Sequence, residues 1–400
     1  MGGPLEGVKV LDVAQAAAGP LGAMLLAEMG ADVIKVEPPW GDFIRNRPPY
    51  KNGVDLMVFG FSRSKRSVVL DLKQEKDKAL IFELVKWADV FVENYKVGTA
   101  EKMGLGYEAL SKINPRLIYC SVAGFGHYGP LREQGTMAGI AAAFAGWGSF
   151  SGRPGGPTEQ PRGGYSPDTI TPQYTCLAIL SALFYREKTG KGQKIETSQV
   201  EAGVAFLQSP ATEYLVTGKQ PQAMGSASAL IAPSQVFPTA EGYLAVDAPN
   251  DRVWARLCEA INASGLAQNP DFVTNPLRVQ NRRRLIPILE AVFSERPAAQ
   301  WLSVLKEHRV PCALVSADLD DIYADPQVQS NSMITAMEHP KAGWLKTTTV
   351  PWEFNRTPGG IKSIGPLLGE HTKEIFEQFG FTPPDTTDVA AARASRATGR

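Results

Sequence analysis

Strand-forming and helix-forming segments alternate along the first 125 residues, and this alternation constrains the fold more than any other feature of the chain. Short β-rich runs are separated by stretches whose apolar residues recur at helical spacing, as in residues 75–88. Such strands form βαβ units, because parallel neighbours need a crossover connection. The sequence therefore predicts an α/β fold with a parallel sheet, whose strands lie at residues 8–13, 31–37, 67–72, 89–93 and 117–122.

The length of 400 residues predicts more than one domain. We expect a large Rossmann-like domain over residues 1–207 and a linker over 208–235, where Pro, Gln, Ala and Ser collect. A smaller α+β domain is expected at 236–325, and residues 326–381 are expected to return and complete the large domain. Residues 382–400 are rich in Thr, Ala and Arg, which predicts a mobile tail.

Charge is balanced, with 41 basic and 41 acidic residues, so the net charge favours neither nucleic acid nor an anionic membrane as a partner. The longest apolar runs cover about ten residues, too few to span a bilayer. Residues 1–20 lack the pattern of a secretory signal. The four cysteines and the four histidines show no metal-ligand spacing. We therefore expect a cytoplasmic protein with reduced cysteines, no metal site, no nucleic-acid partner and no membrane span.

The turn after the first strand, at residues 14–22, lacks the G-x-G-x-x-G glycines that let a backbone approach a pyrophosphate. Glu37 ends the next strand, where an NAD enzyme often keeps a ribose-binding acid, but a single acid is weak support. A Rossmann-like sheet used for another ligand is the simpler interpretation. Asn94 and Lys96 follow the fourth strand and are placed to meet a nucleotide, because ligands bind beyond the carboxyl ends of parallel strands.

Three cations, Arg63, Lys65 and Arg66, gather in the loop before the third strand. Arginine and lysine are the usual donors to phosphate, so this loop is a candidate phosphate anchor. A solvated turn explains the same residues, and the sequence does not choose between the two.

Asp168 is the acid with the most distinctive surroundings, because it follows a Gly- and Pro-rich loop and precedes a long helix. Aspartate is a favoured helix N-cap, which gives it a purely structural interpretation. A carboxylate near a helix N-terminus is also suited to act as a nucleophile, with the glycine-rich loop shielding a covalent intermediate from water. The residues alone leave both interpretations open.

Many ordered segments resemble the family III CoA-transferases, the group that includes the carnitine, formyl and oxalate CoA-transferases. The resemblance starts with the first strand and turn, at residues 4–20, and extends to about residue 380. It implies an interlocked homodimer that uses coenzyme A or an acyl-CoA as substrate and binds no permanent cofactor. The other segments that carry it are 26–37, 64–72, 88–94, 103–107, 114–118, 121–126, 182–193, 310–312, 325–326, 338–340 and 365–371.

The resemblance assigns a role to Asp168, which falls where the family has its catalytic aspartate. It implies that this carboxylate attacks an acyl-CoA thioester to form a mixed anhydride, and that CoA returns to give an aspartyl-CoA thioester. A carboxylic or dicarboxylic acid then takes CoA through a second anhydride. Succinyl-CoA is the donor expected from the habit of the family.

The resemblance also implies which residues bind CoA. Ala17 replaces a glutamine that some members place near the active site, and Gln15 lies two residues earlier. Pro38 stands where many members have an arginine near the adenine, so the adenine contacts are expected to differ. The expected CoA-binding residues are Gln15, Ala17, Lys65, Arg66, Asn94, Lys102 and Met103.

Three alternatives stay open. The α-methylacyl-CoA racemases of the same superfamily need a proton-transfer pair where this chain has Met137 and Ala138, and His127 lies ten residues before Met137. An intramolecular CoA-transferase, which moves CoA between two carboxylates of one diacid, would keep Asp168. A heteromer with a paralogous subunit is the third alternative, although a purely structural subunit would have no need of Asp168.

Overall fold

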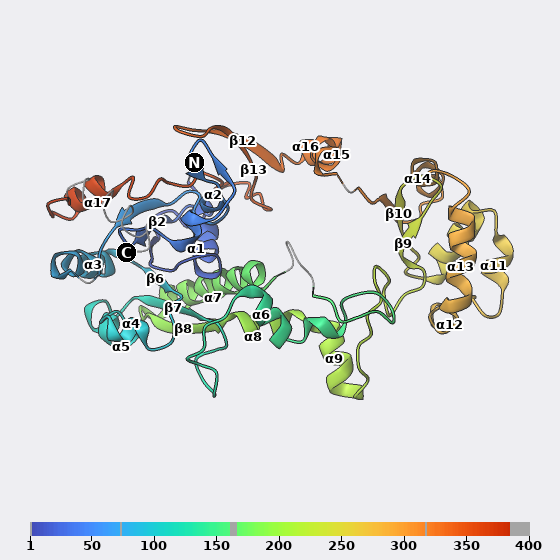
Figure 1. The fold of residues 1–400 in the computed structure, drawn as a ribbon, viewed down its shortest axis with the longest axis horizontal. Coiled ribbons are helices and arrows are strands. Elements are labelled where there is room, and N and C mark those ends of the chain that lie inside the picture. The colour runs from blue at the N-terminus through green and yellow to red at the C-terminus, as the bar shows by residue number, and fades with distance from the viewer. Residues whose placement is uncertain (1, 73, 161–165, 317, 385–400) are drawn as a thin grey trace. The chain divides into compact units, whose positions relative to one another are not determined.

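The structure is a computed structural model that describes residues 2–72, 74–160, 166–316 and 318–384 (Figure 1). The chain forms two compact units. The large unit comprises the described residues within Met1–Trp147, Gln160–Thr212 and Asn331–Arg400, and the small unit comprises those within Gly148–Glu159 and Glu213–Ser330.

A six-stranded parallel sheet forms the centre of the large unit, in the order β5-β2-β1-β6-β7-β8. The five expected strands all belong to it, and β8 adds an edge, so the predicted α/β class is confirmed. The order reverses at β1, whose two neighbours are β2 and β6. The bounds are β1 Lys9–Asp12, β2 Asp32–Glu37, β5 Arg66–Val69, β6 Val90–Glu93, β7 Ile118–Ala123 and β8 Gln193–Ser198.

Helices cover both faces of this sheet (Figure 1), because a parallel sheet buries apolar side chains on each side. Along β1, Leu11 belongs to one layer of the core and Val10 to the other. The layer of Leu11 contains α3 (Glu75–Trp87), α5 (Tyr107–Ile113) and α17 (Thr372–Gln378). The layer of Val10 contains α1 (Ala18–Glu28) and α7 (Pro167–Thr189).

Shorter elements complete the large unit. The hairpin of β3 (Tyr50–Lys51) and β4 (Val54–Asp55) is tied to the late hairpin of β12 (Ile334–His339) and β13 (Gly343–Thr348), because Lys51 donates to the carbonyl of Trp344 at 2.9 Å. The chain after the small unit thus returns to the first 60 residues. The remaining elements are η1 Phe43–Asn46, α2 Met57–Phe61, α4 Thr99–Lys102, α6 Ala138–Phe144, η2 Trp147–Ser149 and α8 Gln199–Phe206, of which η2 ends within the small unit.

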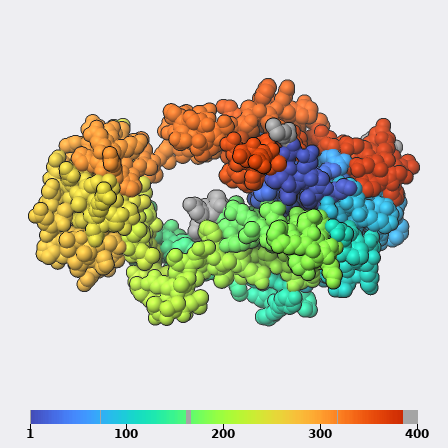
Figure 2. All heavy atoms as spheres, turned by 180° about the vertical axis from the view of Figure 1, so that it is seen from behind, coloured from blue at the N-terminus to red at the C-terminus, as the bar shows by residue number. Residues whose placement is uncertain are grey.

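The small unit has a core of its own, built on a three-stranded antiparallel sheet in the order β11-β10-β9. Within this core the ring of Phe293 packs at a tilt against that of Phe237, with centroids 4.9 Å apart, and edge-to-face against that of Trp301, with centroids 5.3 Å apart. The residues around this core, 237–312, pack into one body, yellow to light orange in Figure 2. The elements are β9 Ser234–Pro238, β10 Tyr243–Asp247, β11 Cys312–Leu314, α9 Gln208–Thr217, α10 Asp251–Ala260, α11 Ser264–Gln268, α12 Asn275–Gln280, α13 Arg282–Phe293, α14 Ala298–Glu307, α15 Leu319–Ala324 and α16 Pro326–Ser330, of which α9 begins within the large unit.

The structure divides the chain differently from the expected boundaries. Residues 148–159 belong to the small unit, where the amide of Gly225 donates to the carbonyl of Gly152 at 2.8 Å. The expected linker begins with helix α9, and the small unit extends through α16 to Ser330. Of the expected tail, only residues 382–384 are described, and they form no helix or strand. No helix among the described residues is long and apolar enough to cross a membrane.

Candidate active site

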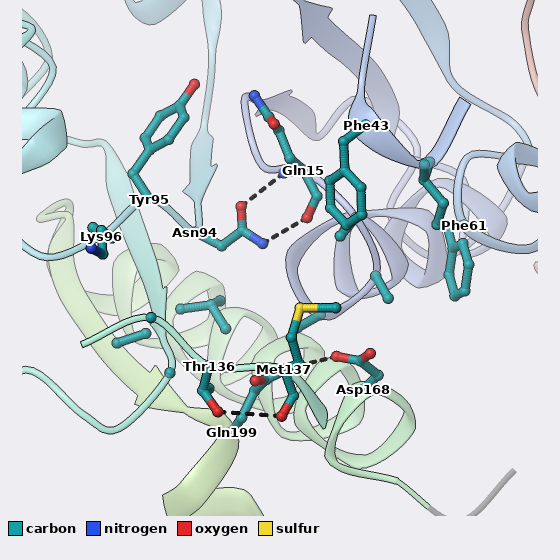
Figure 3. A pocket seen from close by; sticks show the side chains of 18 of the residues that line it. Gln15, Phe43, Phe61, Asn94, Tyr95, Lys96, Thr136, Met137, Asp168 and Gln199 are labelled. Carbon is teal, nitrogen blue, oxygen red and sulfur yellow. Dashed lines mark hydrogen bonds between the residues drawn. The ribbon is translucent and has the colours of Figure 1, made fainter. Parts of the chain in front are cut away.

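A cavity of about 480 Å³ lies in the large unit at the carboxyl ends of β1, β6 and β7 (Figure 3). This edge includes the point where the strand order reverses, and open parallel sheets bind their ligands there. Asp168 is the one carboxylate among the described residues that line it. The wall is formed by residues 15–18, 43, 44, 47, 57, 61, 94–97, 122–124, 132, 134–137, 168 and 199.

Asn94 and Gln15 clamp the ends of β6 and β1 together (Figure 3). The amide N–H of Gln15 donates to Oδ1 of Asn94 at 2.8 Å, and Nδ2 of Asn94 donates to the Gln15 carbonyl at 2.7 Å. Gly19 follows in helix α1, and a Cβ there would overlap the Cβ of Ala14. The predicted residues Gln15, Ala17 and Asn94 therefore all line the cavity, with the Asn94 amide already bonded to backbone.

Asp42 fixes the opposite wall. Its carboxylate accepts from the backbone N–H of Ala16 at 3.0 Å and of Ile44 at 3.1 Å, and from Nζ of Lys35 at 3.1 Å. Burial alone would lower the pKa of Lys35, but Asp42 and the neighbouring carboxylates Asp12 and Glu37 raise it above its ordinary value. Lys35 is therefore charged, and η1 is held to the turn that starts α1.

Asp168 is the second residue of helix α7, after Pro167, while Ser166 occupies the N-cap position. The structural interpretation as an N-cap is therefore wrong. Burial raises the pKa of the half-buried Asp168 carboxyl, and a hydrogen bond from Gln199 partly opposes that rise. The side-chain amide of the buried Gln199 donates to Oδ1 of Asp168. The result is a desolvated carboxylate with one oxygen fixed by an amide, next to the positive end of a long helix.

The basic loop is not brought to the cavity. The Lys65 ammonium is fully buried and contacts a carboxylate oxygen of Asp12 and the carbonyl of Pro20, both at 2.7 Å. Burial lowers the pKa of Lys65 to about 8 although Asp12 opposes the shift. Arg66 lies on the edge strand and pairs with Asp32 and Glu374, both at 2.8 Å. Neither cation is free to bind a phosphate in the cavity.

Lys102 and Met103 also lie outside the wall of the cavity. Lys102 is exposed at the end of α4, and Met103 packs against the core layer of α3 and α5. Tyr95 and Lys96, which precede them in the chain, line the cavity. The sequence predicts a nucleotide contact for Lys96, because this residue comes soon after a strand.

The sequence analysis does not predict four of the residues that line the cavity, namely Gln199, Phe43, Phe61 and Arg47. Gln199 directly follows β8, so its position at the carboxyl edge of the sheet was the available signal. The other three lie in η1, α2 and the loop after η1, which meet the cavity through tertiary packing alone.

The site offers no proton-transfer group where a racemase needs one. Met137 lines the cavity and Ala138 begins helix α6. His127 contacts the hydroxyl of Ser121 at 2.7 Å and lines a second cavity of about 220 Å³, which shares Lys96 and Val97 with the first. Among the residues that the structure describes, no cluster of His, Cys, Asp or Glu could hold a metal ion.

An α/β fold with a carboxylate-bearing cavity at the switch point of its sheet is typical of proteins that bind small molecules. The family model described as CoA-transferase family III matches residues 5–372, and the chain belongs to this family. The family predicted from the sequence is confirmed. The chain therefore transfers CoA between acyl-CoA thioesters and carboxylic acids.

Individual relatives agree with this assignment. The chain is 36% identical over 377 residues to the human succinyl-CoA:glutarate CoA-transferase, covering 94% of this chain and 86% of that protein. It is 34% identical to a succinyl-CoA–D-citramalate CoA-transferase of Chloroflexus aurantiacus, covering 98% of each chain. A solved structure of a CAIB/BAIF family protein from Brucella suis is similar with a TM-score of 0.84 and 33% identity, covering 95% of this chain and all of that one.

Proposed function

We propose that Asp168 is the nucleophile that carries CoA transfer. The observation that supports it is the position of this half-buried carboxylate in the cavity, at the start of α7, with Gln199 bonded to one oxygen. Burial raises the pKa of Asp168 because it removes water from the charged form. The same loss of hydration makes the free oxygen a better nucleophile than an exposed carboxylate.

The transfer follows four balanced steps. The free oxygen of Asp168 attacks the carbonyl of the donor thioester, and CoA leaves as the thiolate. The thiolate attacks the aspartyl carbonyl of the resulting anhydride, which releases the donor acid and leaves an aspartyl-CoA thioester. The acceptor carboxylate attacks this thioester and expels the thiolate. The thiolate then attacks the acceptor carbonyl of the second anhydride, so acyl-CoA forms and the Asp168 carboxylate returns.

The chain's own residues hold the reacting groups in this scheme. Gln199 orients the Asp168 carboxylate and leaves its second oxygen directed at the substrate. The amide donor of Gln199 and the N-terminus of α7 stabilise negative charge as it develops at the reacting carbonyl. Aligned groups exchange the acyl unit faster than water can hydrolyse it.

CoA itself is proposed to bind along the segment from Asn94 to Val97, which lines the cavity and includes the exposed ammonium of Lys96. Lys102 and Met103 lie just beyond this segment and remain predicted contacts for the outer part of CoA. Succinyl-CoA is the proposed donor, because several of the relatives are named as succinyl-CoA transferases. No permanently bound cofactor enters any step.

A homodimer in the cytoplasm is proposed as the working form. Helices α6, α7 and α8 pack against one another, and together they expose large apolar side chains that a second copy would cover. The four cysteines form no disulfide, as expected in a reducing compartment. The exposed side chains are Ile140, Phe144, Leu177, Phe184, Tyr185, Val204 and Phe206. A sedimentation-equilibrium mass of one chain at micromolar concentration would contradict the homodimer and favour a paralogous partner.

Chemical trapping tests the role of Asp168. The protein is incubated with a panel of acyl-CoAs, hydroxylamine is added, and peptides are mapped by mass spectrometry. A hydroxamate on Asp168, absent from the Asp168→Asn variant, supports the proposal, and the acyl-CoA that yields it identifies the donor. CoA transfer without any modification of Asp168 would refute it.

A further inference from the structure

The charges of the cavity are unequal. Its wall contains one carboxylate, Asp168, and three cations, Arg47, Lys96 and Arg132. Arg132 contacts its neighbour Glu133 at 3.3 Å, whereas the guanidinium of Arg47 has no ion pair or side-chain hydrogen bond within the described chain. A cavity with this balance favours ligands that carry more than one negative charge.

Contacts of η1 hold the backbone of Arg47 in place. Its backbone N–H donates to the carbonyl of Ile44 at 3.1 Å, at the end of η1. Asp42, which caps η1 and binds the turn at Ala16, fixes this element against the start of α1. The guanidinium lies over the ring of Phe43, 5.2 Å from its centroid. Stacking on a ring leaves the N–H groups at the edge of the guanidinium free to meet a carboxylate in bidentate fashion.

We propose that Arg47 binds the distal carboxylate of a dicarboxylic acid while its other carboxylate reacts at Asp168. The inference rests on the proposed function, and it makes Arg47 the residue that selects diacids over monoacids as acceptors. Phe43, Met57 and Phe61 line the same cavity and supply an apolar surface for the methylene groups between the two carboxylates. A five-carbon diacid spans about 5 Å between its terminal carbons, from bonds of about 1.5 Å, which a cavity of about 480 Å³ accommodates.

The other two cations are less suited to this task. In Figure 3, Lys96 and Tyr95 lie at one end of the view, whereas Phe43, Phe61 and Asp168 lie at the other. Lys96 follows the strand whose end is proposed to hold CoA. Arg132 already contacts a carboxylate, and an ion pair of that kind competes with a substrate.

The test compares glutarate with pentanoate, which has the same carbon count and lacks the second carboxylate. With one donor held constant, the Arg47→Gln variant is expected to lower kcat/KM for glutarate at least tenfold and to change kcat/KM for pentanoate less than twofold. Arg47→Lys should keep part of the preference, because an ammonium supplies charge without the bidentate geometry. Arg132→Gln removes the same charge from the wall and should leave the ratio of the two acids unchanged.

An equal loss for both acids in Arg47→Gln, or an intact preference for glutarate, would overturn the assignment. Calorimetric binding of glutarate and pentanoate to the protein without any CoA ester gives the same comparison without turnover. Glutarate binding that weakens tenfold in Arg47→Gln supports the assignment, and unchanged binding overturns it. Failure of the hydroxylamine trap would refute the role of Asp168, whereas the comparison of glutarate with pentanoate tests the contact of Arg47, so the failure of one proposal can be distinguished from the failure of the other.

Discussion

Replacement of Asn94 by alanine tests how the cavity is held open. The substitution removes both hydrogen bonds that join Asn94 to the backbone of Gln15, at 2.8 and 2.7 Å. Each such bond contributes about 1 kcal/mol, so the loss is about 2 kcal/mol at the junction of β1 and β6. If the loss is confined to the turn before α1, its opening equilibrium rises roughly 30-fold.

Hydrogen exchange read by mass spectrometry measures this opening directly. Peptides that contain residues 14–18 should exchange roughly 30-fold faster in Asn94→Ala, and kcat/KM for CoA transfer should fall because the wall of the cavity loosens. Asn114→Ala is the matched control. Asn114 donates to the carbonyls of Val85 and Ala88 at 3.1 and 2.8 Å, near the amino ends of β6 and β7.

The control should lose comparable stability without faster exchange at residues 14–18. Unchanged exchange of this turn in Asn94→Ala, or equal acceleration in both variants, would refute the view that the Asn94 clamp shapes the cavity locally.

Three further predictions concern charged groups. Asp168→Ala should reduce CoA transfer to background while circular dichroism and CoA affinity stay close to those of the original chain, and full activity would exclude Asp168 as nucleophile. Gln199→Leu removes the donor that opposes the rise in the pKa of Asp168, so the pH at which trapping reaches half its maximal rate should move upward; a downward shift would contradict this. Burial alone would raise the pKa of Glu37, but Arg45, Lys35 and Ser67 together lower it to about 2. This carboxylate therefore stabilises the fold above its ordinary pKa of 4.5, and the contribution is lost as pH falls toward 2. Glu37→Gln should lower the free energy of unfolding by about 3–5 kcal/mol at pH 7. The free energy of unfolding, measured by denaturation at several pH values between 4.5 and 2, should then depend less on pH than in the original chain, and an unchanged pH dependence would contradict the pairing.

The sheet could be predicted because its determinants are local. Strands such as Val90–Glu93 are buried on both faces, so they appear in the sequence as continuous apolar runs between helical segments. The domain boundaries are harder to predict from the sequence. Residues 148–159 join the small unit through contacts with residues far along the chain, such as the hydrogen bond from Gly225, and local composition does not report such contacts.

The features of the site also fall into those that the sequence predicts and those that only the tertiary structure shows. Sequence by itself determined the α/β sheet and the family, because these depend on local periodicity and on motifs of fixed spacing, and it predicted Asp168 as the nucleophile. Only the tertiary structure decided which cations reach the cavity. The sequence makes Lys65 a candidate phosphate ligand, yet its ammonium is buried in an ion pair with Asp12. The exposed Arg47 lines the cavity instead. The reason is physical: a charged side chain goes where its desolvation is compensated, and that depends on partners that only folding brings together.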